Sequence, residues 1–178
     1  MRLAPVPLFY ARNPRVAIEF ADESSRTTHG AEEAVDACRY YAGLIIGALQ
    51  GIHKDELLAG VFEPVPGIWK EQWLAPKILE VAKGSYKRDD PPALSGTGGY
   101  VVPSLAVALW AFYKSNNFRD GALLAVNVGF DADTYGAIYG QLAGAYYGES
   151  GIPEGWREVI AERGVITSFA ERLFALRV

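Results

Sequence analysis

The sequence predicts an all-α fold, an orthogonal array of helices around a central helix rich in glycine and alanine. Apolar residues in segment 32–52 recur at intervals of three and four, the spacing of one helix face. Segment 135–148 is a second apolar run, made mostly of small residues. Alternating apolar and polar residues, the pattern of a half-buried strand, are scarce. With 178 residues and no convincing repeat, the chain is predicted to form one domain, residues 1–178.

The other helices are predicted from caps, breakers and apolar spacing. Asn13-Pro14 is a typical cap and first-turn pair, which predicts a helix to about Ser24. The proline-rich segments 63–67 and 88–92 are predicted loops. Further helices are predicted at residues 54–61, 70–83 with an interruption at Pro76, 102–114, 118–126, 153–163 and 167–175.

Composition excludes several classes of function. Half of the residues are hydrophobic and the net charge is −4, which is no electrostatic match for nucleic acid or an anionic membrane. Segment 32–52 carries four charged side chains, which argues against a membrane span. The single cysteine, Cys38, is expected to be a small buried hydrophobe rather than a reactive thiol. The first fifteen residues do not resemble a signal peptide, so a cytoplasmic location is expected.

Two carboxylates and a hydroxyl stand within four residues, immediately before segment 135–148. Asp131, Asp133 and Thr134 are hard oxygen ligands of the kind that Mg²⁺ requires. Carboxylates at a helix N-terminus also stay ionised more easily, because the helix dipole is positive there. The alternative is an ordinary Asp or Thr helix cap, which needs only one of the three residues.

The helix that follows carries glycine at every fourth position. Gly136, Gly140, Gly144 and Gly148 fall on one face, although each interior glycine costs roughly 1 kcal/mol of helix stability relative to alanine. Such a row is expected where another backbone approaches closely. Gln141 and the polar start exclude a membrane dimer stripe. A buried central helix that presents acidic ligands at its N-terminus is therefore predicted.

With these motifs the chain resembles the ADP-ribosylglycohydrolase family, which includes the dinitrogenase-reductase-activating glycohydrolases. The most specific part is Gly-x-Asp-Ala-Asp-Thr at residues 129–134, followed by the glycine-rich helix and by Ile-Pro-x-x-Trp at residues 152–156. Three further stretches resemble the family in the same order, namely residues 1–6, 28–40 and 98–112. The resemblance covers nearly the whole chain and implies an all-helical fold.

The resemblance also implies an activity and a set of site residues. The reaction would be hydrolysis of the glycosidic bond between ADP-ribose and a protein side chain or small molecule, at a dinuclear Mg²⁺ or Mn²⁺ centre. Asp131 would be catalytic, and the metal ligands would be Asp131, Asp133 and Thr134. His29 and Tyr100 would position ADP-ribose, and the loop at Gly98 would approach its diphosphate.

Each substrate-binding residue has a plainer alternative. Taken alone, His29 is a turn residue or a donor at a helix start, and the glycines around Gly98 form a flexible connector. Tyr100 alone is an ordinary core aromatic. The chain also departs from the family at Pro103, where relatives often carry an acidic residue, and at Phe130, where glycine or aspartate is usual and a larger ring is expected to crowd the metal site.

Full-length relatives are roughly twice as long, and this chain resembles their C-terminal half. The resemblance implies that an N-terminal half supplies a Thr-Asp-Asp metal triplet and an acidic residue near the scissile bond. Asp89-Asp90 is a poor replacement, because it lies in a proline-flanked loop without a preceding threonine. The expected partners are a separately encoded N-terminal half or a second copy of the chain, and the faces that such a half covers should be apolar. A truncated remnant or an internal start is the alternative.

Two rival functions stay open at this point. One is a non-catalytic module that binds ADP-ribose or another nucleotide, and the other is a structural protein that keeps the scaffold without turnover.

Overall fold

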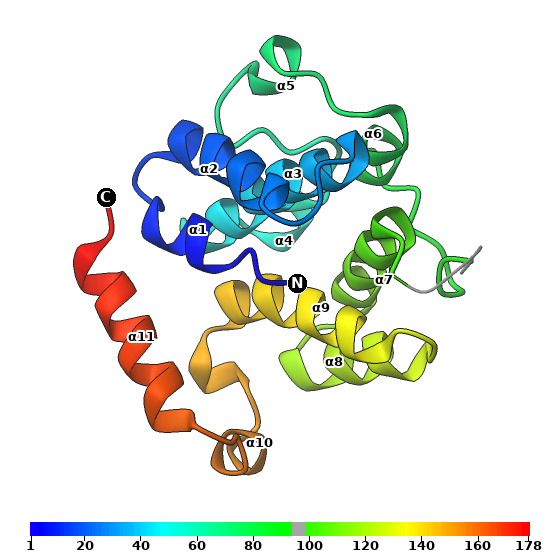
Figure 1. Ribbon diagram of the computed structural model, residues 1–178. Coiled ribbons are helices and arrows are strands. Elements are labelled where there is room, and N and C mark those ends of the chain that lie inside the picture. Colours follow the sequence, from blue (N-terminus) through cyan, green and yellow to red (C-terminus); the bar gives the residue numbers. More distant parts are fainter. Residues whose placement is uncertain (94–98) are drawn as a thin grey trace.

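The computed structural model describes residues 1–93 and 99–178, and this part of the chain is helical without β-strands (Figure 1). The predicted all-α fold is confirmed. The helices are α1 (Pro5–Phe9), α2 (Pro14–Arg26), α3 (Glu32–Leu49), α4 (Lys54–Leu57), α5 (Ile68–Glu71), α6 (Pro76–Ala82), α7 (Val101–Lys114), α8 (Phe118–Asn127), α9 (Ala132–Tyr147), the 3₁₀ turn η1 (Glu149–Gly151), α10 (Glu154–Glu158) and α11 (Arg163–Leu176). None of these helices is long and apolar enough to cross a membrane.

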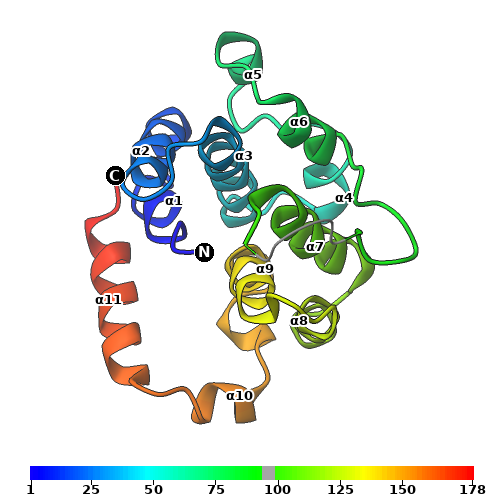
Figure 2. The ribbon, with the colours of Figure 1, turned by 45° about the vertical axis from the view of Figure 1, so that its right-hand side comes forward.

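Helix α3 is the most deeply buried element of the array. It is buried on almost every side between Val35 and Ala48, as expected for a helix that is apolar all round. It packs against α2, α6, α7 and α9, which surround it in both views (Figures 1 and 2). The helix ends three residues before the predicted position 52, because Gly51 adopts a left-handed conformation (φ +78°) that stops it.

A buried ion pair on α3 attaches the segment between α5 and α6. The Arg39 guanidinium donates to the Asp36 carboxylate at 2.5 Å and to the main-chain oxygen of Gln72 at 3.0 Å. The second Asp36 oxygen accepts from the Ala75 N–H at 2.6 Å. The predicted interruption of segment 70–83 at Pro76 is observed, since α5 ends at Glu71 and Pro76 is the first residue of α6.

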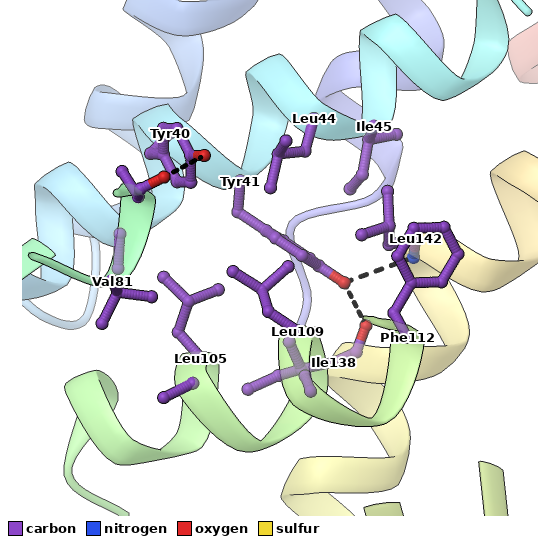
Figure 3. Packing of buried hydrophobic residues seen from close by; sticks show 14 of the residues in the cluster. Tyr40, Tyr41, Leu44, Ile45, Val81, Leu105, Leu109, Phe112, Ile138 and Leu142 are labelled. Atoms are coloured by element: carbon purple, nitrogen blue, oxygen red, sulfur yellow. Dashed lines mark hydrogen bonds between the residues drawn. The ribbon is translucent and has the colours of Figure 1, made fainter. Parts of the chain in front are cut away.

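Helix α9 packs on α3, α7 and α8 through one face, which includes Tyr135, Ile138 and Leu142. The buried Tyr41 hydroxyl fixes α9 to α3, since it donates to the Ile138 carbonyl and accepts from the Leu142 N–H at 3.3 Å (Figure 3). Ile138 and Leu142 are four residues apart, so their carbonyl and N–H form one pair of the regular main-chain hydrogen bonds of α9. The Tyr41 hydroxyl contacts both members of this pair. Burial raises the pKa of Tyr41 strongly, so it stays a neutral donor.

The glycine row does not meet another backbone in the described part of the chain. A Cβ at Gly136 would lie 2.9 Å from the Val126 side chain, whereas nothing described lies within 4 Å of a Cβ at Gly140 or Gly144. The expected close approach is therefore found only at Gly136, where the neighbour is a side chain of α8 rather than another backbone. The rest of the row is an open face of α9.

The C-terminal elements differ most from the prediction. The predicted helix 153–163 ends at Glu158, and α11 begins at Arg163 rather than at residue 167. Helix 54–61 likewise ends early, at Leu57. Tryptophans, as large apolar residues, are expected to fill the core or its edge. Trp69 and Trp110 are buried as expected, whereas Trp73 is 78% exposed.

The contact between Tyr41 and α9 predicts a measurable loss of stability. Tyr41→Phe removes a buried hydroxyl that bonds to two main-chain groups, so the free energy of unfolding should fall by about 1–2 kcal/mol. Urea unfolding followed by circular dichroism measures this change. Tyr113→Phe, at a 43% exposed position, is the control and should stay within about 0.5 kcal/mol of the parent. Equal stability of the two variants would contradict this role of Tyr41.

Candidate functional site at the start of helix α9

The chain enters α9 through an unusual turn. Gly129 and Phe130 both have positive φ, +82° and +54°, a conformation that glycine and aspartate adopt more easily than phenylalanine. The Phe130 side chain is 86% exposed. Its ring therefore points to solvent, and the expected crowding of the site by this residue is not observed.

Asp131 does not cap the helix through its carboxylate. It occupies the cap position, but it accepts no hydrogen bond from the amides of its own first turn, all of which lie in the described residues. Instead, its Oδ1 accepts a hydrogen bond of 2.8 Å from the Thr134 hydroxyl. Its Oδ2 lies 4.0 Å from the position that a Cβ at Gly99 would occupy. The simple cap alternative therefore fails for Asp131, which is half-buried beneath the entry to α7.

A cavity of about 420 Å³ lies beside this turn, within the usual size range of small-molecule sites. It joins regions that are far apart in the sequence, because its walls come from the N-terminal stretch, the α2–α3 connection, the start of α7 and the first turns of α9. The predicted residues His29 and Thr134 both line it. The other lining residues are Met1, Arg2, Leu3, Ser24, Ser25, Thr28, Ala34, Cys38, Gly99, Val101, Ser104 and Ile138.

His29 is held by the turn that ends α2. Its main-chain N–H donates to the Ser25 carbonyl at 2.7 Å, and its own carbonyl accepts from the Ser25 hydroxyl at 2.9 Å. Ring atom Nδ1 lies 2.9 Å from the Thr28 hydroxyl. The ring is exposed at the cavity wall, so Nε2 is available for a ligand.

Arg2 is a cavity residue for which sequence reasoning assigned no role. Its guanidinium donates to the Ser24 carbonyl at 2.6 Å and to the Thr28 hydroxyl at 3.2 Å, which ties the N-terminal stretch to the end of α2. The residue is exposed and lines the same cavity as His29. In the sequence, only the position of Arg2 within residues 1–6, which resemble the family, indicates a role in the site, because a single arginine forms no recognisable motif. It places a positive charge beside a hollow of nucleotide size.

Tyr100 lies next to the cavity but is not among its lining residues, whereas its neighbours Gly99 and Val101 are. Its hydroxyl donates to Glu33 at 2.6 Å and accepts from Lys77 at 2.9 Å. The Lys77 ammonium also lies 5.3 Å from the centre of the ring. Tyr100 thus links α3, α6 and the start of α7. Gly98, predicted to approach a diphosphate, lies outside the described residues.

Cys38 also faces the cavity, at a half-buried position of α3. Burial raises the pKa of its thiol, so the neutral form predominates at neutral pH. This agrees with the expected role of a small apolar residue rather than a nucleophile.

The predicted metal ligands have suitable chemistry but are few. Asp131 and Asp133 offer carboxylates and Thr134 a hydroxyl, all at a helix N-terminus, and Asp133 is exposed. Among residues 1–93 and 99–178, no group of three or more His, Cys, Asp and Glu side chains is arranged to hold a metal ion. Since Mg²⁺ takes six oxygen ligands, this turn fits one part of a metal site, and other ligands must come from water, substrate or another segment.

An all-helical array with an Asp-x-Asp-Thr turn beside a cavity is the arrangement expected of the ADP-ribosylglycohydrolase family. The family model named ADP-ribosylglycohydrolase matches residues 1–178, and the chain belongs to this family.

Among its relatives, ADP-ribosylarginine hydrolase Tri1 of Pseudomonas putida is 38% identical over 98% of this chain and 44% of its own length. The Serratia proteamaculans protein of the same name is 30% identical over 98% of this chain and 45% of its own length. A solved structure, described as an ADP-ribosylglycohydrolase-related protein complex, superposes with a TM-score of 0.85 at 40% identity, covering 99% of this chain and 59% of that one. The chain thus spans less than half the length of these two curated relatives.

The contact of Tyr100 with Glu33 predicts a shift in titration. The hydrogen bond from Tyr100, assisted by Lys77 and opposed by partial burial, lowers the pKa of Glu33 below its ordinary value. A depressed carboxyl pKa stabilises the fold above the unfolded-state pKa, and this contribution disappears as the pH falls through the folded-state pKa. Tyr100→Phe should therefore raise the Glu33 pKa toward its ordinary value.

An NMR titration of the Glu33 side-chain carboxyl carbon measures this shift, with Tyr10→Phe as the control. An unchanged Glu33 titration in Tyr100→Phe would show that the tyrosine hydroxyl is not the main cause.

Proposed function

We propose that this chain is a segment of an ADP-ribosylglycohydrolase that binds ADP-ribose in the cavity beside α9. The supporting observation is that His29, Gly99 and Thr134, from three separate regions, line one cavity of about 420 Å³, with Asp131 hydrogen-bonded to Thr134 at its edge. Family membership, carried by the whole chain, supports the same assignment.

The reaction proposed is hydrolysis of the bond between the anomeric carbon of ADP-ribose and a nitrogen or oxygen of its acceptor. Water adds its hydroxyl to the anomeric carbon, and the acceptor leaves with the remaining proton. An acceptor arginine is the first choice, because the Pseudomonas and Serratia relatives are named ADP-ribosylarginine hydrolases. A Rhodospirillum rubrum relative, 38% identical over 36% of this chain and 22% of its own length, is named for a modified dinitrogen reductase, which favours a protein as the substrate.

Asp131, Asp133 and Thr134 would hold Mg²⁺ or Mn²⁺ as part of the family's dinuclear centre. A bound divalent ion would polarise the ribose hydroxyls and activate water near the anomeric carbon. Thr134 keeps the Asp131 carboxylate oriented through its 2.8 Å hydrogen bond.

The remaining cavity residues would bind the substrate. His29 and Arg2, fixed by main-chain contacts to the end of α2, are placed to donate hydrogen bonds to ADP-ribose oxygens. The glycine-rich loop before α7, with Gly98, would approach the diphosphate, where a side chain would hinder contact with main-chain N–H groups. Tyr100 would border the ribose or base while its hydroxyl stays bonded to Glu33.

The small number of acidic ligands has a consequence for activity. Three ligand side chains do not complete a dinuclear site, so further carboxylates and a general base would have to come from another segment of the family's fold. We therefore expect the isolated chain to bind ADP-ribose with little or no turnover. The small number of metal ligands also favours a second candidate function, a module that binds ADP-ribose without cleaving it.

Calorimetric titration of the chain with ADP-ribose, in Mg²⁺ and then in EDTA, tests the metal site. The Asp131→Ala/Asp133→Ala variant should bind ADP-ribose about tenfold more weakly than the parent in Mg²⁺, because loss of both carboxylate ligands should cost roughly 1.4 kcal/mol or more of binding free energy. In EDTA, the variant and the parent should bind ADP-ribose with equal affinity.

Asp89→Ala/Asp90→Ala is the matched control, because it removes the same charge from an exposed loop, and it should bind like the parent. Equal affinity of all three proteins in Mg²⁺ would remove the metal assignment. Measurable ADP-ribose binding without cleavage of ADP-ribosylated arginine would favour the binding module.

A further inference from the structure

A second cavity, of about 430 Å³, lies near the other end of α9. Its walls come from the start of α4, the segment after α6, the end of α7 and the last turn of α9. It shares no lining residue with the cavity beside the first turn of α9. Thr134 and Tyr146 are twelve residues apart on α9, which separates the two cavities by roughly 18 Å along the helix axis. The residues that line the second cavity are His53, Lys54, Asp55, Leu58, Lys87, Tyr113, Asn116, Tyr146 and Tyr147.

Two lysine ammonium groups in this cavity have no carboxylate partner in the described part of the chain. The Lys54 ammonium donates to the Ser115 carbonyl and lies 5.1 Å from the centre of the Phe112 ring. The Lys87 ammonium donates to the Leu58 carbonyl. No described carboxylate lies within 4.0 Å of either ammonium, although the whole chain carries a net charge of −4. Each ammonium has three N–H donors, so two on each remain for water or a ligand.

The surroundings of both lysines suit a bound anion. Lys54 is half-buried, and burial lowers the pKa of its ammonium, with Asp55 acting in the opposite direction. A bound anion would favour the charged form and would offset the lost hydration. The stem of Lys87 packs over Gly84, where an added Cβ would lie 3.0 Å from Lys87 Cδ, so the stem is held in place. The plainer role of Lys54, neutralising the negative end of the α7 dipole, uses about half of one charge.

The other polar groups of the cavity are mainly hydrogen-bond donors. His53 Nδ1 accepts from the Asp55 N–H at 3.4 Å, which leaves the proton of the neutral ring on Nε2. The Tyr146 hydroxyl accepts from the Lys54 N–H at 3.3 Å, and its own O–H has no acceptor among the described residues. Asn116 adds an exposed amide. Among the lining residues, the Asp55 carboxylate is the opposing charge, but its side chain is 92% exposed and is therefore screened by solvent.

We propose that this second cavity binds the phosphate group of a small organic phosphate. A phosphate dianion offers several acceptor oxygens for both ammonium groups and for the neighbouring donors of His53 and Tyr146. A carboxylate has two oxygens and one charge, so it matches fewer of these donors. The rings of Tyr113 and Tyr147 border the cavity and provide an aromatic wall for the organic part of the ligand. This site is independent of the function proposed for the cavity at the start of α9.

The test is an NMR titration of the ¹⁵N-labelled chain with phenyl phosphate, which combines a phosphate with one aromatic ring. The amides of Lys54 and Tyr147 should shift, and the affinity should exceed those for inorganic phosphate and for benzoate at least threefold. Lys54→Gln/Lys87→Gln should weaken phenyl phosphate binding at least tenfold. Lys70→Gln/Lys83→Gln removes the same charge from exposed positions outside the cavity, so this control should bind like the parent.

A second variant covers failure of the lysine variant to fold, which its circular dichroism spectrum would reveal. Asn116→Asp adds a negative charge at an exposed side chain of the cavity, and it should weaken phenyl phosphate binding at least threefold. Asp131→Ala/Asp133→Ala should leave this binding unchanged, which separates the second cavity from the metal site at the start of α9. Shifts confined to amides outside the cavity, equal affinity for phenyl phosphate and either simpler probe, or unchanged affinity in Asn116→Asp would overturn the proposal.

Discussion

The position of α9 depends on one buried hydroxyl. Tyr41 reaches from α3 into the hydrogen-bond ladder of α9, where it serves both the Ile138 carbonyl and the Leu142 N–H (Figure 3). A buried hydroxyl that satisfies two main-chain groups fixes distance and rotation together, because any turn of α9 about its axis breaks both bonds. In this position of α9, Thr134 lines the cavity and Asp131 is hydrogen-bonded to it.

The two sides of α9 have different roles in the fold. The side with Tyr135, Ile138 and Leu142 is buried against three helices, and the opposite side with Gly140 and Gly144 is open. Glycine on an open helix face lowers helix stability and adds no packing within the described residues.

Local sequence signals predicted most helices well, because caps, prolines and apolar spacing act over a few residues. The Asn13-Pro14 start, α3 and α7 follow from such patterns within a few residues. Errors arose where the outcome depends on packing between distant segments. The exposure of Trp73 and the open glycine row follow from which surfaces find partners, and no local pattern contains that information. Thr134 was singled out by the Asp-x-Asp-Thr pattern and His29 by the family resemblance, and both line the cavity. Arg2 was missed because a single arginine has no spacing to recognise.

The central claim is that a divalent ion binds at the first turn of α9, beside the cavity. Paramagnetic broadening by Mn²⁺ tests it most directly, because the effect is local and needs neither substrate nor turnover. In spectra of the ¹⁵N-labelled chain, a small amount of Mn²⁺ should first broaden the amides of Asp131 to Thr134, followed by those of Gly99 and Thr28 across the cavity. Broadening that appears first at other acidic positions, such as Asp55 or Asp89, while the α9 turn stays sharp would contradict the account.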